Sequence, residues 1–271
     1  MIKQAIIPLA GLGTRLLPLT SVFAKELLPI NGKPGLEYII EECIEAGIKE
    51  IVFIISKKKL MIKKYFYNDK FYKDIIKKKG DPKIIKEYKK ILKYKKMIKF
   101  VFQDKPLGTG DAVYKTKKFI TDKYFLMLLP DDLIIKKNCS KSMIAVHNKF
   151  KASVMASMKV NKNDVSRWGI YNIRKKIDKN NFIINNVVEK PSIKTSPSNN
   201  AVIGRYILPK TIFSKLKSLK PGKSGEFHIT DAIQALIEDD NQFIGHNFSG
   251  KYLDCGTMKG YIKSTLEISK Q

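Results

Sequence analysis

The first half of the chain alternates short apolar runs with segments of helical periodicity, and this alternation constrains the fold more than any other feature. Apolar runs of strand length lie at residues 4–9, 49–56, 98–103 and 124–129. Between the first two, apolar side chains recur at helical spacing from Leu36 to Ile44, and Gly47 stands where a helix would end. Strands that alternate with helices predict a mainly parallel sheet with helices on both faces. We therefore expect an α/β fold with a Rossmann-like, doubly wound, mixed sheet.

The second half contains more strands and fewer helices. Strands are expected at residues 152–160, 169–173, 182–189, 202–208 and 242–247, and helices near 210–216, 229–237 and 258–268. This pattern indicates an extension of the sheet that receives a second ligand. No linker rich in Pro, Gly or Ser divides the 271 residues, so we expect a single domain over residues 1–271, with halves at 1–135 and 136–271.

The charge is concentrated in one segment. The chain has a formal net charge of +27, and residues 57–99 hold 18 Lys against four acidic residues, in two or three expected helices. The excess is Lys rather than the Arg forks that read bases. A solvated helical face is therefore favoured over a polyanion-binding surface, and a nucleic-acid partner is not expected.

The cysteines and the N-terminus bear on the compartment. Cys43, Cys139 and Cys255 are odd in number and far apart, which suits neither a disulfide framework nor a four-ligand zinc site. The N-terminus has no signal-peptide pattern, and no apolar run is long enough to span a membrane. We expect a cytoplasmic protein with no membrane partner.

A glycine loop follows the first expected strand. Gly11 and Gly13 allow backbone N–H groups to approach a ligand closely, and Arg15 adds a permanent positive charge. Leu16 stands where a dinucleotide-binding loop would have its third glycine, and no Gly-Lys-Ser/Thr sequence of the ATPase type follows. A purely structural turn is the alternative, but Arg15 and the polar Lys25-Glu26 pair favour phosphate binding.

Two acidic residues are candidate metal ligands. Asp131 closes the strand at 124–129 and so lies at the edge of the sheet where ligands bind, and Asp254 occupies a similar place before the last helix. A hard cation such as Mg²⁺ prefers one or two carboxylates together with phosphate oxygens. A turn or helix-cap role is the alternative for either residue.

Other polar residues allow two interpretations each. Glu189-Lys190 pairs an acceptor for hydroxyls with a cation for phosphate, although such a pair also occurs as a surface ion pair. Trp168 is expected either to line a sugar pocket or to pack in the core. The histidines are predicted to be structural or on the surface, since none can be paired with a nucleophile; they are His147, His228 and His246.

Taken in order, these motifs resemble the UTP:glucose-1-phosphate uridylyltransferases, the bacterial UDP-glucose pyrophosphorylases, over essentially the whole chain. The motifs that carry the resemblance are Gly11-Leu12-Gly13-Thr14-Arg15-Leu16-Leu17-Pro18, Ala24-Lys25-Glu26-Leu27-Leu28-Pro29, Lys33-Pro34, Leu129-Pro130-Asp131, Val188-Glu189-Lys190-Pro191, Ile203-Gly204-Arg205-Tyr206, Glu226 with Thr230-Asp231-Ala232-Ile233, and Asp254-Cys255-Gly256.

The resemblance implies a fold of the nucleotide-diphospho-sugar transferase type, a nucleotide-binding half followed by a sugar-phosphate-binding half, and the substrates UTP and glucose 1-phosphate. It implies Mg²⁺ as cofactor and a homo-oligomer, dimer or tetramer. The roles it implies are catalysis for Arg15, Lys25 and Lys190; nucleotide binding for Ala10, Gly11, Gly13, Glu26, Gln103 and Gly108; sugar binding for Gly169, Glu189 and Gly204; and metal binding for Asp131 and Asp254.

Three positions depart from the family pattern. Ser21 stands for a usual Lys, Glu37 for Gln, and Asp111 for His in the Gly-Leu-Gly-His-Ala segment. A change beside the nucleotide pocket is expected to affect UTP binding or base choice, while the cations and carboxylates of the site are retained. Two alternatives stay open on sequence alone: a thymidylyltransferase acting on glucose 1-phosphate, and a regulatory paralogue that binds nucleotide-sugar without catalysis.

Overall fold

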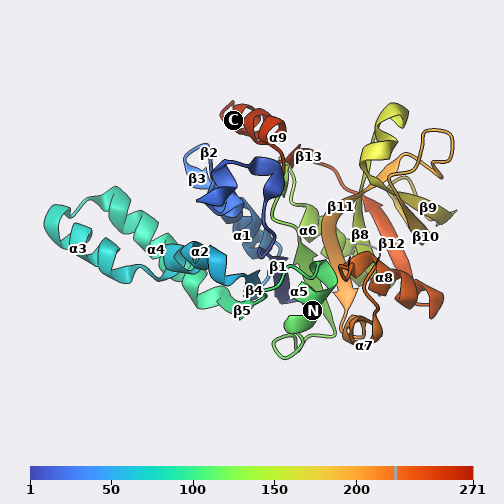
Figure 1. Ribbon diagram of the computed structural model, residues 1–271, viewed down its shortest axis with the longest axis horizontal. Helices are drawn as coiled ribbons and strands as arrows, with labels where there is room; N and C mark the ends of the chain where they lie inside the picture. Colours follow the sequence, from blue (N-terminus) through green and yellow to red (C-terminus); the bar gives the residue numbers. More distant parts are fainter. Residues whose placement is uncertain (223–224, 271) are drawn as a thin grey trace.

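A nine-stranded sheet forms the centre of the molecule in the computed structural model, which describes residues 1–222 and 225–270 (Figure 1). Its strand order is β5-β4-β1-β6-β11-β8-β12-β10-β9. The strands are β1 (Gln4–Pro8), β4 (Glu50–Ile55), β5 (Ile98–Phe102), β6 (Tyr124–Leu128), β8 (Ser153–Lys159), β9 (Gly169–Lys176), β10 (Asn181–Glu189), β11 (Asn200–Pro209) and β12 (Phe243–Asn247).

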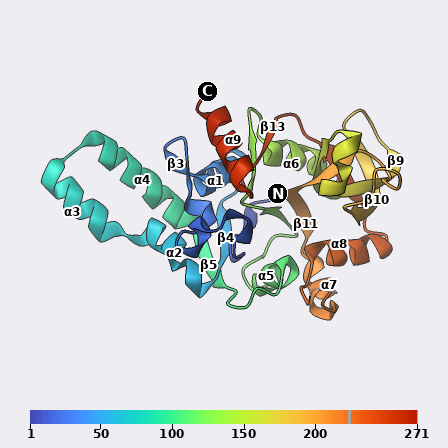
Figure 2. The same ribbon diagram turned by 45° about the horizontal axis from the view of Figure 1, so that its top comes forward.

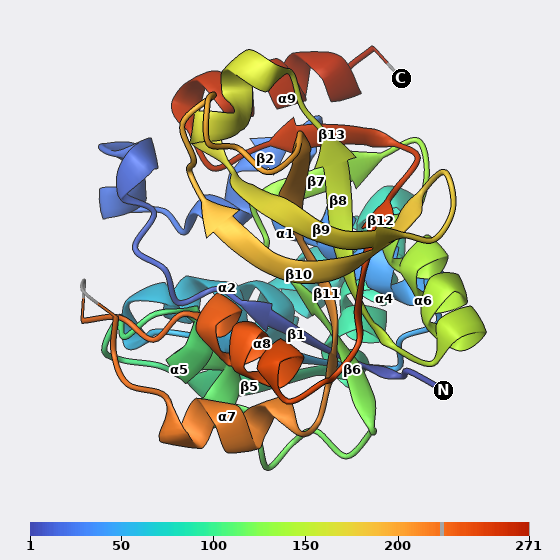
Figure 3. The same ribbon diagram turned by 90° about the vertical axis from the view of Figure 1, so that its right-hand side faces the viewer.

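The two halves of the sheet differ in strand direction. The four strands from the first part of the chain, β5, β4, β1 and β6, pair in parallel, as their near-continuous apolar sequences predict. Antiparallel pairs dominate on the other side of β6, where β11 pairs with β6 and β8, and β10 pairs with β9 and β12. The predicted doubly wound mixed sheet is confirmed, and its crossed, twisted strands are visible in Figure 3.

Helices cover both faces and bury a separate core on each. One face packs against α1 (Gly35–Glu45), α2 (Leu60–Tyr67), α4 (Pro82–Met97) and α6 (Cys139–Phe150). The other packs against α5 (Thr109–Lys115), α7 (Ile212–Ser218) and α8 (Ile229–Glu238). Alternate residues of β1 divide between the two cores: Ala5 and Ile7 belong to the first, and Ile6 belongs to the second.

Two helices project from the body. α3 (Asp69–Lys79) and α4 extend to one side as a pair, which we call the Lys-rich hairpin (Figures 1 and 2). No residue of α3 is buried, so the solvated lysine face expected from the sequence is present there. Lys59, in the 3-10 helix η4 (Lys57–Lys59) that precedes α2, is an exception among the lysines of residues 57–99, because its side chain is only 9% exposed.

A small second sheet was not expected from the sequence and matters for the site. β7 (Asp132–Ile135) pairs antiparallel with β13 (Lys251–Asp254), and the register sets Asp254 opposite Asp132. β13 leads into α9 (Met258–Ile268), so the expectation that Asp254 closes a strand before the last helix is confirmed. A further hairpin joins β2 (Pro29–Ile30) to β3 (Lys33–Pro34). Across residues 1–222 and 225–270, no helix has the length and apolar character to cross a membrane.

Candidate active site

A cavity of about 490 Å³ opens where β1, β5 and β6 end. The loops after these strands meet there, as the strand order requires of a doubly wound sheet. The six residues predicted to bind a nucleotide all line it: Ala10, Gly11, Gly13, Glu26, Gln103 and Gly108. Lys25 and Asp131 lie in the same wall.

Gly108 explains why part of the cavity wall consists of backbone atoms. It adopts a φ of +94°, and a Cβ at this position would stand 2.5 Å from the carbonyl oxygen of Phe227. Only glycine fits such a place. The segment before α8 therefore packs directly against the loop after β5, and the cavity gains a wall of peptide groups with no side chain in the way.

The side chain of Gln103 is held in one orientation. It is 5% exposed, and its Nε2 donates to the carbonyl oxygen of Gly108 at 3.0 Å and to Oδ2 of Asp111 at 2.7 Å. Asp111 is the residue that replaces His in the family pattern, and here it fixes the amide. Because both hydrogens of the amide nitrogen have acceptors, the amide oxygen is the group that Gln103 can offer to a ligand.

Glu26 takes part in a buried ion pair. Lys59 donates from Nζ to both carboxylate oxygens of Glu26, at 2.8 and 2.9 Å, and to the carbonyl oxygen of Leu9 at 2.8 Å. Burial lowers the pKa of Lys59, while the charge of Glu26 opposes this shift. Lys59 thus connects the end of β1 to the loop that carries Lys25, a role that its place in a run of lysines did not reveal.

Asp131 is the centre of a charge cluster. Its Oδ2 accepts from Lys25 Nζ at 2.8 Å and from Arg15 Nη2 at 3.1 Å. Burial alone would raise the pKa of Asp131, but the charges of Lys25 and Arg15 and its hydrogen bonds outweigh it and lower the pKa. The carboxylate is therefore ionised at neutral pH. Arg15 remains 62% exposed and lies toward solvent, where an anion can reach it.

Asp254 stands beside Asp131, and Gly256 makes room for both. A Cβ on Gly256 would lie 2.8 Å from Asp131 Oδ2, 3.1 Å from Asp254 Oδ1 and 2.7 Å from Arg15 Nη2. Two carboxylates that share one small space suit Mg²⁺, which takes one or two such ligands and completes its shell with water and phosphate. Within the described ranges no group of three or more His, Cys, Asp or Glu side chains could hold a metal ion.

The predicted sugar-binding residues lie on neighbouring strands. Gly169 and Glu189 face each other in the β9–β10 register, and a Cβ on Gly169 would stand 2.9 Å from Oε2 of Glu189. Gly204, on β11, donates its N–H to Oδ2 of Asp132 at 2.8 Å. Burial, followed by the charge of Asp131, raises the pKa of Asp132 to about 6.

Lys190 follows β10 in an unusual conformation. Its φ is +45°, which costs on the order of 1 kcal/mol for a residue other than glycine, and its N–H donates to the carbonyl oxygen of Trp168 at 2.9 Å. In the part of the chain that the structure describes, its ammonium group has no ion-pair partner. The structure therefore brings Arg15, Lys25 and Asp131 together but does not place Lys190 in contact with them.

The sequence profile of the nucleotidyl transferase family matches residues 4–271. This chain belongs to that family. Among its relatives, UTP–glucose-1-phosphate uridylyltransferase 2 of Staphylococcus saprophyticus is 37% identical over 269 residues, which are 99% of this chain and 92% of that protein. UTP–glucose-1-phosphate uridylyltransferase of Bacillus subtilis is 36% identical over 271 residues, 100% of this chain and 92% of that protein.

Solved structures of similar enzymes superpose on nearly the whole chain. A UDP-glucose pyrophosphorylase crystallised with UDP-glucose has a TM-score of 0.87 at 34% identity and covers 100% of this chain and 99% of its own. A UTP-bound enzyme from Acinetobacter baumannii has a TM-score of 0.89 at 31% identity, covering 99% of this chain and 93% of its own. The resemblance and the fold type inferred from the motifs are thereby confirmed.

In this nucleotidyl transferase, Arg205 supports the site, a role that the sequence did not reveal although the residue lies in the Ile203-Gly204-Arg205-Tyr206 motif. Its side chain is fully buried on β11, and its guanidinium pairs with Glu42 at 2.8 Å. It also donates to the carbonyl oxygens of Leu129 at 3.1 Å and Asp132 at 2.6 Å. These two carbonyls lie on either side of Pro130-Asp131, so Arg205 fixes the turn that presents the Asp131 carboxylate.

Two of the residues that depart from the family pattern, Glu37 and Ser21, and the three histidines are spread over several parts of the structure. Glu37 accepts from Tyr65 and pairs with Lys90 at 2.8 Å, away from the nucleotide cavity, and Ser21 donates to the carbonyl oxygen of Pro18. His147 and His246 are buried and hydrogen-bonded to nearby groups, whereas His228 and Glu226 line the nucleotide cavity. Trp168 is partly buried and packs edge-on against Tyr252.

Proposed function

We propose that this nucleotidyl transferase transfers the uridylyl group from UTP to glucose 1-phosphate, giving UDP-glucose and pyrophosphate. The observation that carries the proposal is the cluster of Arg15, Lys25 and Asp131 at the rim of a cavity walled by a glycine loop. The names of the relatives that match over the full chain support the choice of UTP and glucose 1-phosphate. They do not favour the thymidylyltransferase or regulatory alternatives.

The reaction requires little proton transfer. A phosphate oxygen of glucose 1-phosphate forms a bond to the α-phosphorus of UTP, the α–β phosphoanhydride bond breaks, and its electron pair leaves with pyrophosphate. The second pKa of a phosphate monoester is about 6, so the nucleophile is already mostly a dianion at neutral pH. No general base is needed, in keeping with a cluster built from Arg, Lys and carboxylate side chains.

The protein's task is therefore to bring two polyanions together. Arg15 and Lys25 neutralise the triphosphate and the departing pyrophosphate, and Lys190 binds the phosphate of the sugar substrate. On ligand binding, Arg15 and Lys25 exchange part of their contact with Asp131 for phosphate oxygens. The Asp131 carboxylate then becomes available to a cation.

Asp131 and Asp254 are the residues that would hold Mg²⁺, because their oxygens share the space that Gly256 leaves open. When bound, the ion neutralises charge on the phosphate oxygens. The remaining groups recognise the substrates: the loop at Ala10, Gly11 and Gly13 takes the nucleotide, with Glu26, Gln103 and Gly108 near the base. Gly169, Glu189 and Gly204 take the sugar.

Pyrophosphate release with glucose 1-phosphate, Mg²⁺ and either UTP or dTTP tests the proposal. We expect kcat/KM to favour UTP by at least about tenfold. Asp131→Asn should lower kcat/KM by about 10²–10³, because it removes a metal ligand and the counter-charge of both cations. Asp74→Asn, an equivalent change on the exposed α3, is the matched control and should match wild type. Wild-type turnover in Asp131→Asn, or a preference for dTTP, would overturn the assignment.

Two wider expectations accompany this proposal. A homo-oligomer, dimer or tetramer, is tested by light scattering coupled to size-exclusion chromatography. A cytoplasmic location is supported by three free cysteines, Cys43, Cys139 and Cys255, of which the first two are buried.

A further inference from the structure

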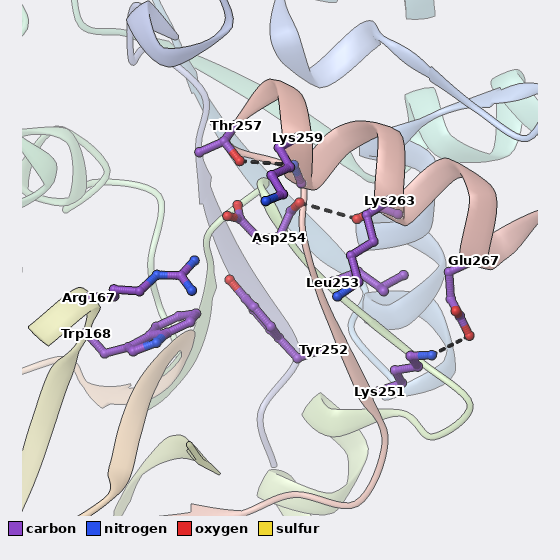
Figure 4. A pocket seen from close by; sticks show the side chains of 12 residues that line it. Arg167, Trp168, Lys251, Tyr252, Leu253, Asp254, Thr257, Lys259, Lys263 and Glu267 are labelled. Atoms are coloured by element: carbon purple, nitrogen blue, oxygen red, sulfur yellow. Dashed lines mark hydrogen bonds and ion pairs between the residues drawn. The ribbon is translucent and has the colours of Figure 1, made fainter. Parts of the chain in front are cut away.

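A second cleft, of about 520 Å³, lies beside Asp254 (Figure 4). One side is formed by the end of the 3-10 helix η5 (Lys162–Arg167) and Trp168, the floor by β13, and the other side by α9. Of the residues singled out in the sequence for a role at the site, only Asp254 and Trp168 line it. The roles implied by the resemblance therefore leave most of this cleft without a function.

The cleft is cationic. Four basic side chains line it against two carboxylates, Asp254 and Glu267, and Lys251 pairs with Glu267 at 2.5 Å. Asp254 Oδ1 is turned to the N–H of Gly256 at 2.8 Å. Arg167 makes only a long, exposed contact with Asp164, at 3.6 Å, and Lys259 and Lys263 complete the set of cations that face the cleft. Figure 4 shows these three side chains around the opening beside Asp254.

Two of these cations form a pair on one helix. Lys259 and Lys263 are four residues apart, so both project from the same face of α9. Both are exposed, and neither makes an ion pair within residues 1–222 and 225–270. Two like charges one turn apart disfavour each other unless an anion lies between them.

An aromatic wall completes the cleft. The rings of Trp168 and Tyr252 meet edge to face, with centroids 5.5 Å apart. Such a wall presents apolar surface next to polar edges, which suits the C–H face of a sugar ring. A ligand with a sugar ring and a phosphate group would therefore satisfy both parts of the cleft.

Hydrogen bonds connect this wall to the predicted sugar-binding residues. The carbonyl oxygen of Trp168 accepts from the N–H of Lys190 at 2.9 Å. Tyr252 donates its hydroxyl to Asp132 Oδ1 at 2.7 Å, and the other oxygen of Asp132 accepts from the N–H of Gly204. The cleft thus adjoins the sugar side of the site, on the face where α9 lies.

We propose that this cleft is an approach site for the sugar phosphate, in which Lys259, Lys263 and Arg167 bind the phosphate dianion before it reaches Asp131 and Lys190. The identity of the ligand rests on the proposed function. The cations of α9 raise the local concentration of the anionic substrate beside the reaction centre. Their contribution appears in sugar-phosphate binding and leaves nucleotide binding unaffected.

Trp168 provides a direct readout because it is the only tryptophan of the chain and lines the cleft. Titration of the apoprotein with glucose 1-phosphate should change its fluorescence and saturate. In Lys259→Ala/Lys263→Ala the Kd should rise about tenfold, as expected for the loss of two partly exposed ion pairs. Glucose without phosphate should produce no saturable change at the same concentrations, and inorganic phosphate should bind more weakly than the sugar phosphate.

The matched control is Lys89→Ala/Lys93→Ala, a pair of exposed lysines with the same spacing on the remote α4. It removes the same charge and should keep the Kd within about twofold of wild type. In turnover assays the α9 variant should raise KM for glucose 1-phosphate about tenfold and leave KM for UTP within about twofold. Equal Kd values in the α9 variant and wild type, or equal losses in both double variants, would overturn the approach site.

The two proposals fail in different ways. If wild-type protein releases no pyrophosphate while the fluorescence titration behaves as stated, the enzymatic proposal fails and the cleft stands as a sugar-phosphate site. If turnover is normal and the α9 variant is indistinguishable from wild type, the cleft proposal fails alone. Melting temperatures of both double variants close to that of wild type will show that neither change unfolds the protein.

Discussion

Removing Arg205 should damage both stability and the geometry of the site. Its guanidinium is fully buried, pairs with Glu42, and donates to the carbonyl oxygens of Leu129 and Asp132. Arg205→Met keeps the apolar stem but leaves Glu42 without its main partner. Breaking a buried ion pair by removing one partner costs about 3–5 kcal/mol. For a chain of this size each kcal/mol lowers the melting temperature by about 2–4 °C, so we expect a loss of about 10 °C.

The double variant Arg205→Met/Glu42→Met separates the two effects. It removes the uncompensated charge, so thermal and urea unfolding should show recovery of at least half of the lost stability. Turnover should not recover to the same degree, because the carbonyls on either side of Pro130-Asp131 still lack their donor. We expect kcat/KM to remain about tenfold or more below wild type.

Two results would refute this reasoning. A single variant that melts within about 2 °C of wild type would mean that the Arg205–Glu42 pair contributes little to folding. A double variant with wild-type kcat/KM would mean that Asp131 is positioned without Arg205. The measurements need only scanning fluorimetry, a urea titration and the pyrophosphate assay.

Three further predictions follow from buried groups. Lys59→Met leaves the Glu26 carboxylate buried without a cation. In steady-state kinetics, KM for UTP should therefore rise about tenfold or more, while KM for glucose 1-phosphate changes less. Asp111→Ala frees the amide of Gln103, and the ratio of kcat/KM for UTP over CTP should fall several-fold. Burial lowers the pKa of His246 in the folded protein. As the pH falls below about 6.5, the unfolded chain therefore takes up a proton before the folded protein does, and the free energy of unfolding decreases. Urea unfolding of His246→Gln should show a weaker pH dependence of stability between about pH 7 and 5.

The nucleotide-binding side of the site could be predicted from the sequence because each of its elements has a recognisable local sequence pattern. An apolar run followed by Gly11 and Gly13 predicts a strand and a tight loop, and an apolar run followed by Asp131 predicts an acid at the ligand edge. Parallel strands then bring these ends together without further information.

The supporting residues could not be predicted in the same way, because their partners are distant in the sequence. Arg205 is buried by a contact with Glu42, 163 residues away. Lys57 and Lys59 are equivalent in the sequence, yet their side chains are 77% and 9% exposed, since only Lys59 packs against Glu26. The sequence predicts a strand ending at Asp254, but not its pairing with β7, because two four-residue strands that lie far apart in the sequence carry no local signal of their pairing.

The Lys-rich hairpin displaces the centre of positive charge from the centre of mass (Figure 1). On a cation-exchange resin the molecule should therefore adsorb with the hairpin foremost, and the salt at which it elutes should follow the lysines of α3 and α4 more than the net charge of the chain. Shortening the hairpin at α3, none of whose residues is buried, would move the elution position while the packing of the core stays in place.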